Sequence, residues 1–272
     1  MKNLIIRAFT GLIFVVVIIS GIWYSAYTFL VLFGIITGLT VWELYGLLYG
    51  KGTNLIKRST QVLGGVYLFA STFMYNYGIA NEDIFLPYLL FVLSIFIMEL
   101  YYKAENPISN WANLLFIQIY AAGSFSLLNL VAIEGGNYSV IPLFAIFVFV
   151  WINDTGAYLV GSTIGKRRLF ERISPKKSWE GFLGGITFVL LVAYWASCYF
   201  VEISWYNWLG LASTIVVFAT WGDLTESLLK RTLKVKDSGN ILPGHGGILD
   251  RFDSIIMAVP AAYIYLELFI RN

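Results

Sequence analysis

A polar segment near the end of a hydrophobic chain holds the residue types that could do chemistry. Residues 223–253 contain five acids, five bases and the only histidine, His245, in a sequence that is 58% hydrophobic and 12% charged. The histidine is flanked by a proline and three glycines: Pro243, Gly244, Gly246 and Gly247. These residue types let the backbone turn tightly and approach a ligand closely. The contrast in polarity predicts a functional site here.

Three aspartates in this segment have the spacing of a metal site. Asp250 and Asp253 are three residues apart just before an apolar run, so a helix would point both carboxylates to one side. Asp223 follows an earlier apolar run, and on a continuing helix it would share a face with Glu226 and Ser227. Mg²⁺ prefers such oxygen ligands and usually retains waters and substrate phosphates. The pattern therefore indicates a metal and phosphate site.

The other charged residues of the segment leave alternatives open. Glu226 and Lys230 are four residues apart, which also suits an ordinary surface ion pair. Arg251 could pair with a phosphate or balance the neighbouring acids. His245 could act as a general base, donate to a phosphate or hold the loop by a hydrogen bond. Without a second histidine a zinc or two-histidine metal site is excluded, and the chain has neither a Gly-x-Ser-x-Gly motif nor a P-loop.

An acid in the middle of an apolar run forms part of a second polar group. Asp154 lies inside the hydrophobic stretch near residues 139–161. A carboxylate in lipid costs about 2.5–3.5 kcal/mol on insertion scales, so we expect Asp154 to face a wet cavity or a partner. A structural hydrogen bond that uses Asn153 and Thr155 is the alternative.

The loop that follows has the composition of an anion site. Lys176 and Lys177 come directly after the rigid Pro175. Ser178 could cap the next helix, whose N-terminus attracts anions. Ordinary cytoplasmic loop charge is the alternative, and it accounts for the basic residues 167–168. We expect Lys176, Lys177 and Ser178 to bind a phosphate group.

Apolar helices must position these residues. A mean hydropathy of +0.75 with 18% aromatic residues exceeds what one soluble core could bury. The chain is therefore predicted to be an all-α, polytopic integral membrane protein, because long apolar runs satisfy their own backbone hydrogen bonds. A span needs roughly 20 apolar residues. Nine runs fit, near 4–22, 25–48, 60–78, 84–102, 111–131, 139–161, 181–201, 204–222 and 254–270. The small-residue pairs 161/165 and 181/185 predict close helix packing.

Basic residues predict the orientation of these spans. Lys and Arg occur in the loops after the second, fourth, sixth and eighth spans, whereas the loops between contain acids and no bases. Because short cytoplasmic loops collect Lys and Arg, the polar loops and the N-terminus are expected in the cytoplasm, with Arg271 as an exception. The chain divides into N-terminal transmembrane helices at 1–150 and a catalytic transmembrane region at 151–272, within one membrane unit. A polar, cytoplasm-facing cavity is expected in the second part.

The C-terminal half resembles a known family, the phosphatidate cytidylyltransferases, also called CDP-diacylglycerol synthases. The resemblance is carried by a run of spaced residues: Ser227, Lys230, Arg231, Lys236, Asp237, Gly239, Leu242, Pro243, His245, Gly246, Gly247, Asp250, Arg251 and Asp253. Residues 153–158 and 173–181 are similar to the same family, with Ser178 where threonine is more usual. The resemblance is strong over 151–253, whereas residues 1–150 match only as hydrophobic spans.

The resemblance implies a reaction in which CTP and phosphatidate give CDP-diacylglycerol and pyrophosphate, with Mg²⁺ required. By matching position, Asp223, Asp250 and Asp253 would hold the metal, and Asp154 and Lys176 would join them in catalysis. The residues expected to bind substrate are Asn153, Lys177, Ser178, Ser227, Lys230, Arg231, Lys236, Asp237, His245, Gly246, Gly247 and Arg251.

The expected partners are CTP, phosphatidate and membrane lipids, with no nucleic acid, and the resemblance also allows a homodimer. The expected location is the cell inner (plasma) membrane, with the active site facing the cytoplasm. A transferase that uses CTP on an isoprenoid lipid is the alternative, since it would need similar metal and phosphate sites. An ion transporter would spread its acids along a path, whereas here they accompany bases and a Gly-Gly loop towards one face.

Overall fold

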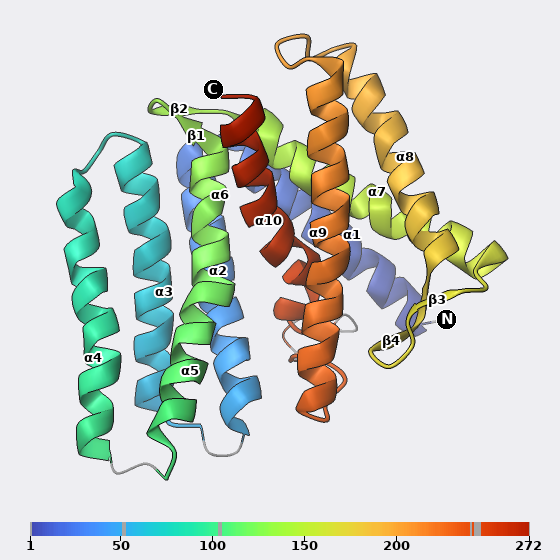
Figure 1. Ribbon diagram of the computed structural model, residues 1–272. Coiled ribbons are helices and arrows are strands. Elements are labelled where there is room, and N and C mark those ends of the chain that lie inside the picture. The colour runs from blue at the N-terminus through green and yellow to red at the C-terminus, as the bar shows by residue number, and fades with distance from the viewer. Residues whose placement is uncertain (1, 51–52, 103–104, 240, 242–245, 272) are drawn as a thin grey trace. The chain divides into compact units, whose positions relative to one another are not determined.

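Helices make up most of the computed structural model (Figure 1). It describes residues 2–50, 53–102, 105–239, 241 and 246–271, without the side chains of 2–8 and 102. The helical elements are α1 (Lys2–Tyr24), α2 (Ala26–Tyr49), α3 (Leu55–Asn76), η2 (Glu82–Phe85), α4 (Leu86–Tyr102), α5 (Pro107–Ile117), η3 (Gln118–Gly123), α6 (Ser124–Ala132), α7 (Val140–Ile164), α8 (Trp179–Ser197), α9 (Trp205–Thr232) and α10 (Leu249–Phe269). Two antiparallel strand pairs interrupt them: β1 (Ile133–Glu134) with β2 (Asn137–Tyr138), and β3 (Arg168–Phe170) with β4 (Ser174–Ser178).

Each predicted apolar range contains a helical run in the part of the chain that the structure describes. The elements α5, η3 and α6 form one such run. Seven runs are long and apolar enough to cross a membrane, namely α2, η2–α4, α5–α6, α7, α8, α9 and α10. Helix α3 is not among them, and its first two turns carry Lys57, Arg58 and Gln61. The all-α integral membrane class is therefore confirmed.

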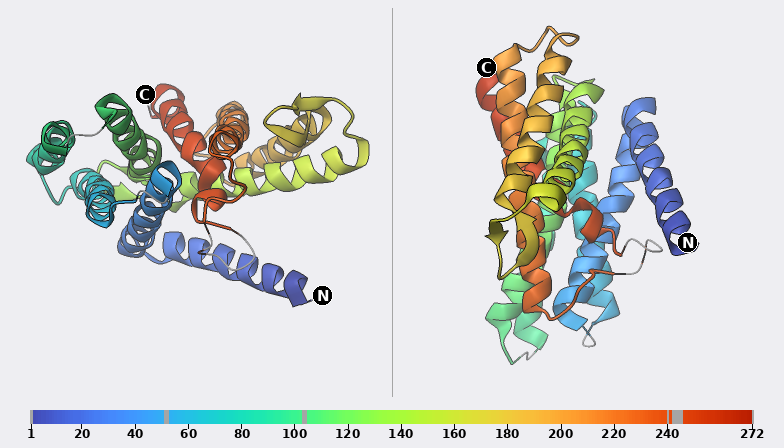
Figure 2. Two further views of the ribbon diagram at one scale, coloured as in Figure 1. Left: turned by 90° about the horizontal axis from the view of Figure 1, so that it is seen from below. Right: turned by 90° about the vertical axis from the view of Figure 1, so that its right-hand side faces the viewer.

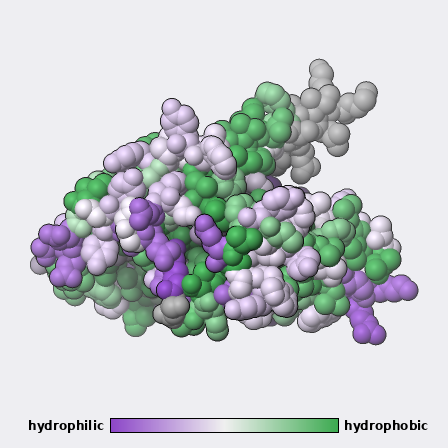
Figure 3. All heavy atoms as spheres, turned by 90° about the horizontal axis from the view of Figure 1, so that it is seen from above, coloured by the Kyte–Doolittle hydropathy of each residue, from purple (hydrophilic) through white to green (hydrophobic). Residues whose placement is uncertain are grey.

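Large apolar side chains are exposed along the helices. Leu12, Leu90 and Leu191 are 63%, 66% and 64% exposed. Figure 3 shows such hydrophobic atoms in green on the surface seen from above. Exposure of this extent would be costly in water, and it suits helices whose outer sides contact lipid.

The described chain forms two compact units, each treated by itself. The first comprises Met1–Val140 and Asp237–Arg251, and the second Ile141–Lys236 and Phe252–Asn272. In the first unit, α2, α3 and the α5–α6 run pack side by side (Figures 1 and 2). Phe29 packs against Phe33 and Phe69 with tilted rings, at centroid distances of 5.0 and 6.0 Å, and all three rings are fully buried. These rings form part of the buried core of the first unit.

Close helix contacts at glycine define the second unit. A Cβ atom on Gly181 would lie 2.8 Å from the Ala157 carbonyl, and one on Gly185 would lie 2.8 Å from the Asn153 carbonyl. The predicted packing role of this glycine pair is thus confirmed, because α7 and α8 meet where α8 lacks a side chain. Helices α8 and α9 also run side by side (Figure 2).

The β3–β4 hairpin lies in a segment predicted as a loop. Its register pairs Arg168 with Ser178 and Phe170 with Ser174. Strand β4 ends at the residue before α8, so the hairpin fixes the direction in which the chain enters that helix.

Replacing Gly185 by alanine is expected to destabilise the protein by about 1–3 kcal/mol, because the added methyl group would overlap the Asn153 side chain and backbone. Gly34→Ala is the matched control, since a Cβ atom there meets only Phe69, at 3.8 Å. It should change stability by no more than about 1 kcal/mol, the helix-propensity difference between the two residues. Thermal unfolding in detergent measures the stability of both variants. Equal unfolding midpoints for Gly185→Ala and Gly34→Ala would contradict the packing role of Gly185.

Candidate functional site

A cavity of about 610 Å³ in the second unit collects most of the predicted upstream residues. A cavity of this size falls in the usual range for small-molecule sites, about 300–1,000 Å³. Its lining includes six residues predicted from the sequence: Asn153, Asp154, Lys176, Lys177, Ser178 and Asp223. These side chains come from α7, from β4 and from α9, so three separate elements build one polar cavity.

Helix α7 contributes an amide and a carboxylate. Asn153 is only 4% exposed, and its Oδ1 atom has no hydrogen-bond partner among the residues described. Asp154 is exposed and lines the cavity, which is the placement that its desolvation cost favours. An unpaired buried oxygen is costly, and a ligand that donates to Asn153 or a cation would remove that cost.

The β3–β4 hairpin brings bases to the start of α8. Ser178 accepts a hydrogen bond from the Gly181 amide at 3.1 Å, which confirms the predicted cap of this helix. Lys176 and Lys177 precede it, and Arg168 lies opposite Ser178 in the hairpin. All four side chains line the cavity. The positive end of the helix and three basic side chains favour an anion there.

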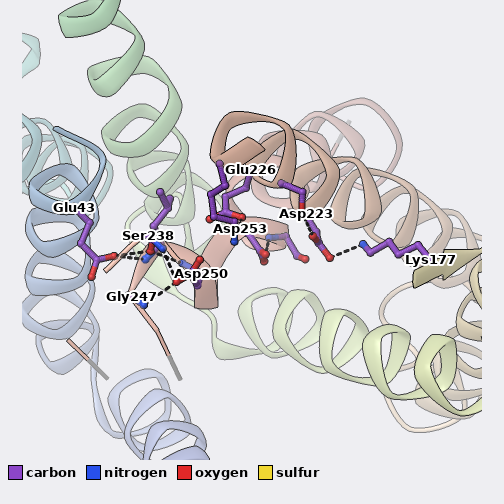
Figure 4. Close-up of polar contacts among 12 residues, drawn as sticks. Glu43, Lys177, Asp223, Glu226, Ser238, Gly247, Asp250 and Asp253 are labelled. Carbon is purple, nitrogen blue, oxygen red and sulfur yellow. Dashed lines mark hydrogen bonds and ion pairs between the residues drawn. The ribbon is translucent and has the colours of Figure 1, made fainter. Parts of the chain in front are cut away.

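Asp223 lies beside one of these bases. Its carboxylate forms an ion pair with the Lys177 ammonium and accepts a hydrogen bond from the Ser227 hydroxyl at 3.2 Å (Figure 4). The two charged side chains are 29% and 27% exposed, so solvent partly screens the pair. The ammonium occupies the kind of position that a metal ion or another cation would take beside this carboxylate.

Glu226 and Lys230 form the ion pair that their four-residue spacing allows, with 2.5 Å between Lys230 Nζ and Glu226 Oε2. It is not the surface pair that the sequence suggested, because the Glu226 side chain is fully buried. Ser227, Lys230, Arg231 and Lys236 do not line the cavity.

Asp253 belongs to the first turns of α10. Its Oδ1 atom accepts from the Ser254 amide at 2.5 Å, and its carbonyl lies so close to α9 that a Cβ on Gly222 would be 2.5 Å away. Within the described ranges, no three or more His, Cys, Asp or Glu side chains gather closely enough to hold a metal ion by themselves.

Asp250 lies in a separate hydrogen-bonded cluster in the first unit. Its Oδ2 atom accepts from the Ser238 amide at 2.9 Å and from the Gly247 amide at 2.8 Å (Figure 4). Glu43 of α2 joins the same cluster through Ser238 and through the amide of Leu249. The carboxylates of Asp250 and Glu43 thus hold both ends of the glycine-rich segment.

The remaining predicted residues lie in or next to the glycine-rich segment, and a Cβ atom on Gly246 would lie 2.5 Å from Asp250 Oδ2. Asp237 and Arg251 are exposed, and Gly246 has a left-handed φ of 82° that favours glycine. His245 lies outside the described residues.

Several residues of these groups were not predicted from the sequence. The polar ones in the cavity are Tyr158, Ser162, Arg168 and Thr220, and in the cluster of the first unit they are Glu43 and Ser238. The sequence gives Arg168 only the signal of ordinary loop charge. Glu43 carries the same signal as Asp154, a lone acid inside an apolar run, and that signal could have identified it.

The donor set of the cavity suits a phosphate-bearing ligand together with Mg²⁺. Asp154, Asp223 and the Asn153 amide offer oxygen atoms, and Mg²⁺ usually takes one or two carboxylates and completes its shell with waters and substrate phosphates. Arg168, Lys176 and Lys177 would meet the remaining phosphate charge.

Comparison with known proteins gives a consistent assignment. A model described as the cytidylyltransferase family matches residues 5–269. A phosphatidate cytidylyltransferase of Bacillus subtilis (strain 168) is 47% identical over 134 residues, which cover 49% of this chain and 50% of that protein. One of Staphylococcus aureus (strain COL) is 50% identical over 122 residues, 44% of this chain and 46% of that protein. The chain thus spans about half the length of the curated relatives it matches.

Removal of the Ser178 hydroxyl is expected to destabilise the start of α8. Ser178→Ala should lower the free energy of unfolding by about 0.5–2 kcal/mol, the usual cost of a lost N-cap. Ser162→Ala is the control, because Ser162 lines the same cavity but is exposed and bonds only within α7. It should stay within about 0.5 kcal/mol of the parent protein. Thermal unfolding compares the two, and an undiminished midpoint for Ser178→Ala would exclude the cap.

Proposed function

Because this chain belongs to the cytidylyltransferase family, we propose that it transfers the cytidylyl group of CTP to phosphatidate, giving CDP-diacylglycerol and pyrophosphate. Relatives named phosphatidate cytidylyltransferase, at about half identity, support this substrate pair. The observation that carries the proposal is the cavity that brings Asp154, Asp223 and Lys177 to the capped end of α8. Such a cavity suits a triphosphate.

The chemistry needs positioning more than proton transfer. A phosphate oxygen of phosphatidate attacks the α-phosphorus of CTP, the bond from that phosphorus to the β-phosphate oxygen breaks, and pyrophosphate leaves. A phosphate monoester is already largely ionised at neutral pH, since its second pKa is about 6. A strong general base is therefore unnecessary, and His245 is proposed as a loop or phosphate-binding residue.

Charge repulsion is the main obstacle, because two polyanions must meet. Lys176, Lys177 and Arg168 would offset this repulsion around the phosphates. The α8 N-terminus would add its partial positive charge. Charge stabilisation and alignment of this kind supply most of the rate enhancement in phosphoryl-type transfer. The other predicted substrate contacts, among them Ser227, Arg231 and Lys236, are proposed to bind phosphate at the same face.

Mg²⁺ is the proposed cofactor. The sequence pattern proposes Asp223, Asp250 and Asp253 as its ligands, and of these Asp223 lines the cavity of the second unit together with Asp154. When bound, Mg²⁺ neutralises phosphate charge and polarises the phosphoryl group. The fit is supported by the carboxylates and by the buried Asn153 oxygen that lacks a partner in the described part of the chain. For Asp223 to bind the ion, the Lys177 ammonium would leave the Asp223 carboxylate and pair with a substrate phosphate instead.

We further propose that nine helices span the bacterial inner membrane, with the site at its cytoplasmic face. CTP would then arrive from the cytoplasm and phosphatidate from the bilayer. The distribution of Lys and Arg among the loops supports this orientation. A homodimer is compatible with the proposal.

Purified protein in detergent should convert CTP and phosphatidate to CDP-diacylglycerol only when Mg²⁺ is present. Asp250→Asn should lower turnover at least about 100-fold, because even the supporting residues of metal sites cost 10–100-fold when changed. Asp83→Asn, a change at an exposed acid of η2, should keep the parent rate. A preference for an isoprenoid phosphate over phosphatidate would overturn the proposed acceptor. Unchanged turnover in Asp250→Asn would remove Asp250 from the metal site.

The proposed orientation predicts opposite locations for two reporter insertions. A reporter inserted after Lys236 should be cytoplasmic, and the same reporter after Glu202, in the turn between α8 and α9, should lie on the other side. Accessibility to a membrane-impermeant reagent distinguishes the two. An external location after Lys236 would contradict the proposed topology.

A further inference from the structure

Glu43 is a buried carboxylate for which the reaction outlined above has no use. It lies in the apolar helix α2 and is only 4% exposed. Its Oε2 atom accepts hydrogen bonds from the Ser238 hydroxyl at 3.1 Å and from the Leu249 amide at 2.9 Å. A charged group inside a membrane helix is costly unless such donors compensate it. Its retention there indicates a role that an apolar residue could not fill.

The first role is to cap α10 from another helix. Leu249 is the first residue of α10, and its amide is one of the N–H groups that have no partner within the helix. Glu43 accepts from this amide, and its negative charge lies at the positive end of the α10 dipole. The carboxylate therefore fixes the position at which α10 begins.

The second role is to orient Ser238 against Asp250. The Ser238 hydroxyl donates to Glu43 and accepts from the Asp250 amide at 3.3 Å, while the Ser238 amide donates to Asp250 Oδ2 at 2.9 Å. Ser238 is thus bonded to both carboxylate residues (Figure 4). Any shift of the Glu43 carboxylate would move the group that holds the Asp250 side chain.

The glycines of this segment match the same arrangement. A Cβ atom on Gly247 would lie 2.3 Å from Glu43 Oε2 and 2.1 Å from the Ser238 hydroxyl, and one on Gly239 would lie 2.5 Å from Glu43 Oε1. Each position needs glycine because the backbone approaches the buried carboxylate so closely. Glycine at these two positions is therefore explained by the close approach to Glu43, without any contact to a substrate.

We propose that Glu43 is a positioning residue, which sets the orientation of the Asp250 carboxylate by capping α10 and holding Ser238. The structural part stands on the contacts of the first unit alone. The consequence for catalysis rests on the proposed function, in which Asp250 holds Mg²⁺. Loss of Glu43 should then weaken the response to Mg²⁺ rather than abolish the chemistry.

The structural part is tested by hydrogen exchange of the purified protein. In Glu43→Ala, the amides of Ser238, Gly247 and Leu249 should exchange at least about tenfold faster than in the parent. Leu249 loses its bond to Glu43, and the other two amides lose the alignment of their bonds to Asp250; a tenfold change corresponds to about 1.4 kcal/mol. Glu99→Ala is the matched control. Glu99 is equally buried at 4%, lies in the same unit, and bonds instead to Lys57 and Asn110. It should leave these three amides unchanged.

The catalytic part is tested by titrating Mg²⁺ in the turnover assay. Glu43→Ala should raise the Mg²⁺ concentration for half-maximal turnover about 10–100-fold, the usual effect of losing a residue that orients a metal ligand. Glu99→Ala should leave it unchanged. Glu43→Gln, which keeps an oxygen acceptor, should restore most of the exchange protection and of the Mg²⁺ response.

If Glu43→Ala does not fold, Ser238→Ala takes its place in both experiments. It should accelerate exchange of the Asp250 amide and shift the Mg²⁺ response in the same direction, since it removes the hydroxyl that joins the Glu43 carboxylate to the Asp250 backbone amide. Equal exchange in Glu43→Ala and Glu99→Ala would contradict the positioning role. Faster exchange with an unchanged Mg²⁺ response would show that Glu43 stabilises this segment but does not position a metal ligand. A parent protein that makes no CDP-diacylglycerol would refute the proposed function, while the exchange result would still decide the structural part.

Discussion

A carboxylate inside an apolar helix must find a hydrogen-bond donor or a cation, and the polar architecture of this protein depends on that constraint. In the second unit, Asp223 pairs with Lys177 and the buried Glu226 pairs with Lys230. In the first unit, Glu43 accepts from a serine and from the first amide of α10. Lys177 comes from a hairpin, Ser238 from a loop and Leu249 from a helix end, so Asp223 and Glu43 hold these segments against apolar helices, whereas Lys230 pairs with Glu226 within α9.

Glycine residues allow the backbone to approach closely enough for these contacts to form. Within the second unit, Gly181 and Gly185 let α8 approach α7, which brings the Ser178 cap and its neighbouring lysines to the α7 face that carries Asn153. Within the first unit, Gly247 lets the backbone approach Glu43. Backbone amides, a helix end and fixed basic side chains are preorganised in this way, and preorganised charge is what a reaction between two phosphate groups needs.

The helices and the Ser178 cap could be predicted because hydropathy, span length and capping chemistry act within a short window of sequence. The β3–β4 hairpin could not, since strands of three and five residues carry too little alternation to be recognised. Glu43 has the same local signal as Asp154, a lone acid inside an apolar run, but that signal does not identify what the acid contacts. Its partner Ser238 is 195 residues away in the chain, so only the folded structure reveals the contact.

Cytidylyl transfer is tested most directly by following two labels of CTP separately. The purified protein would be given phosphatidate, Mg²⁺ and CTP labelled either at the α-phosphate or at the γ-phosphate. Transfer of the cytidylyl group predicts that the α-label enters the lipid fraction and that the γ-label appears only in pyrophosphate. A γ-label in the lipid would instead show phosphoryl transfer, and no α-label in the lipid would contradict the proposed activity.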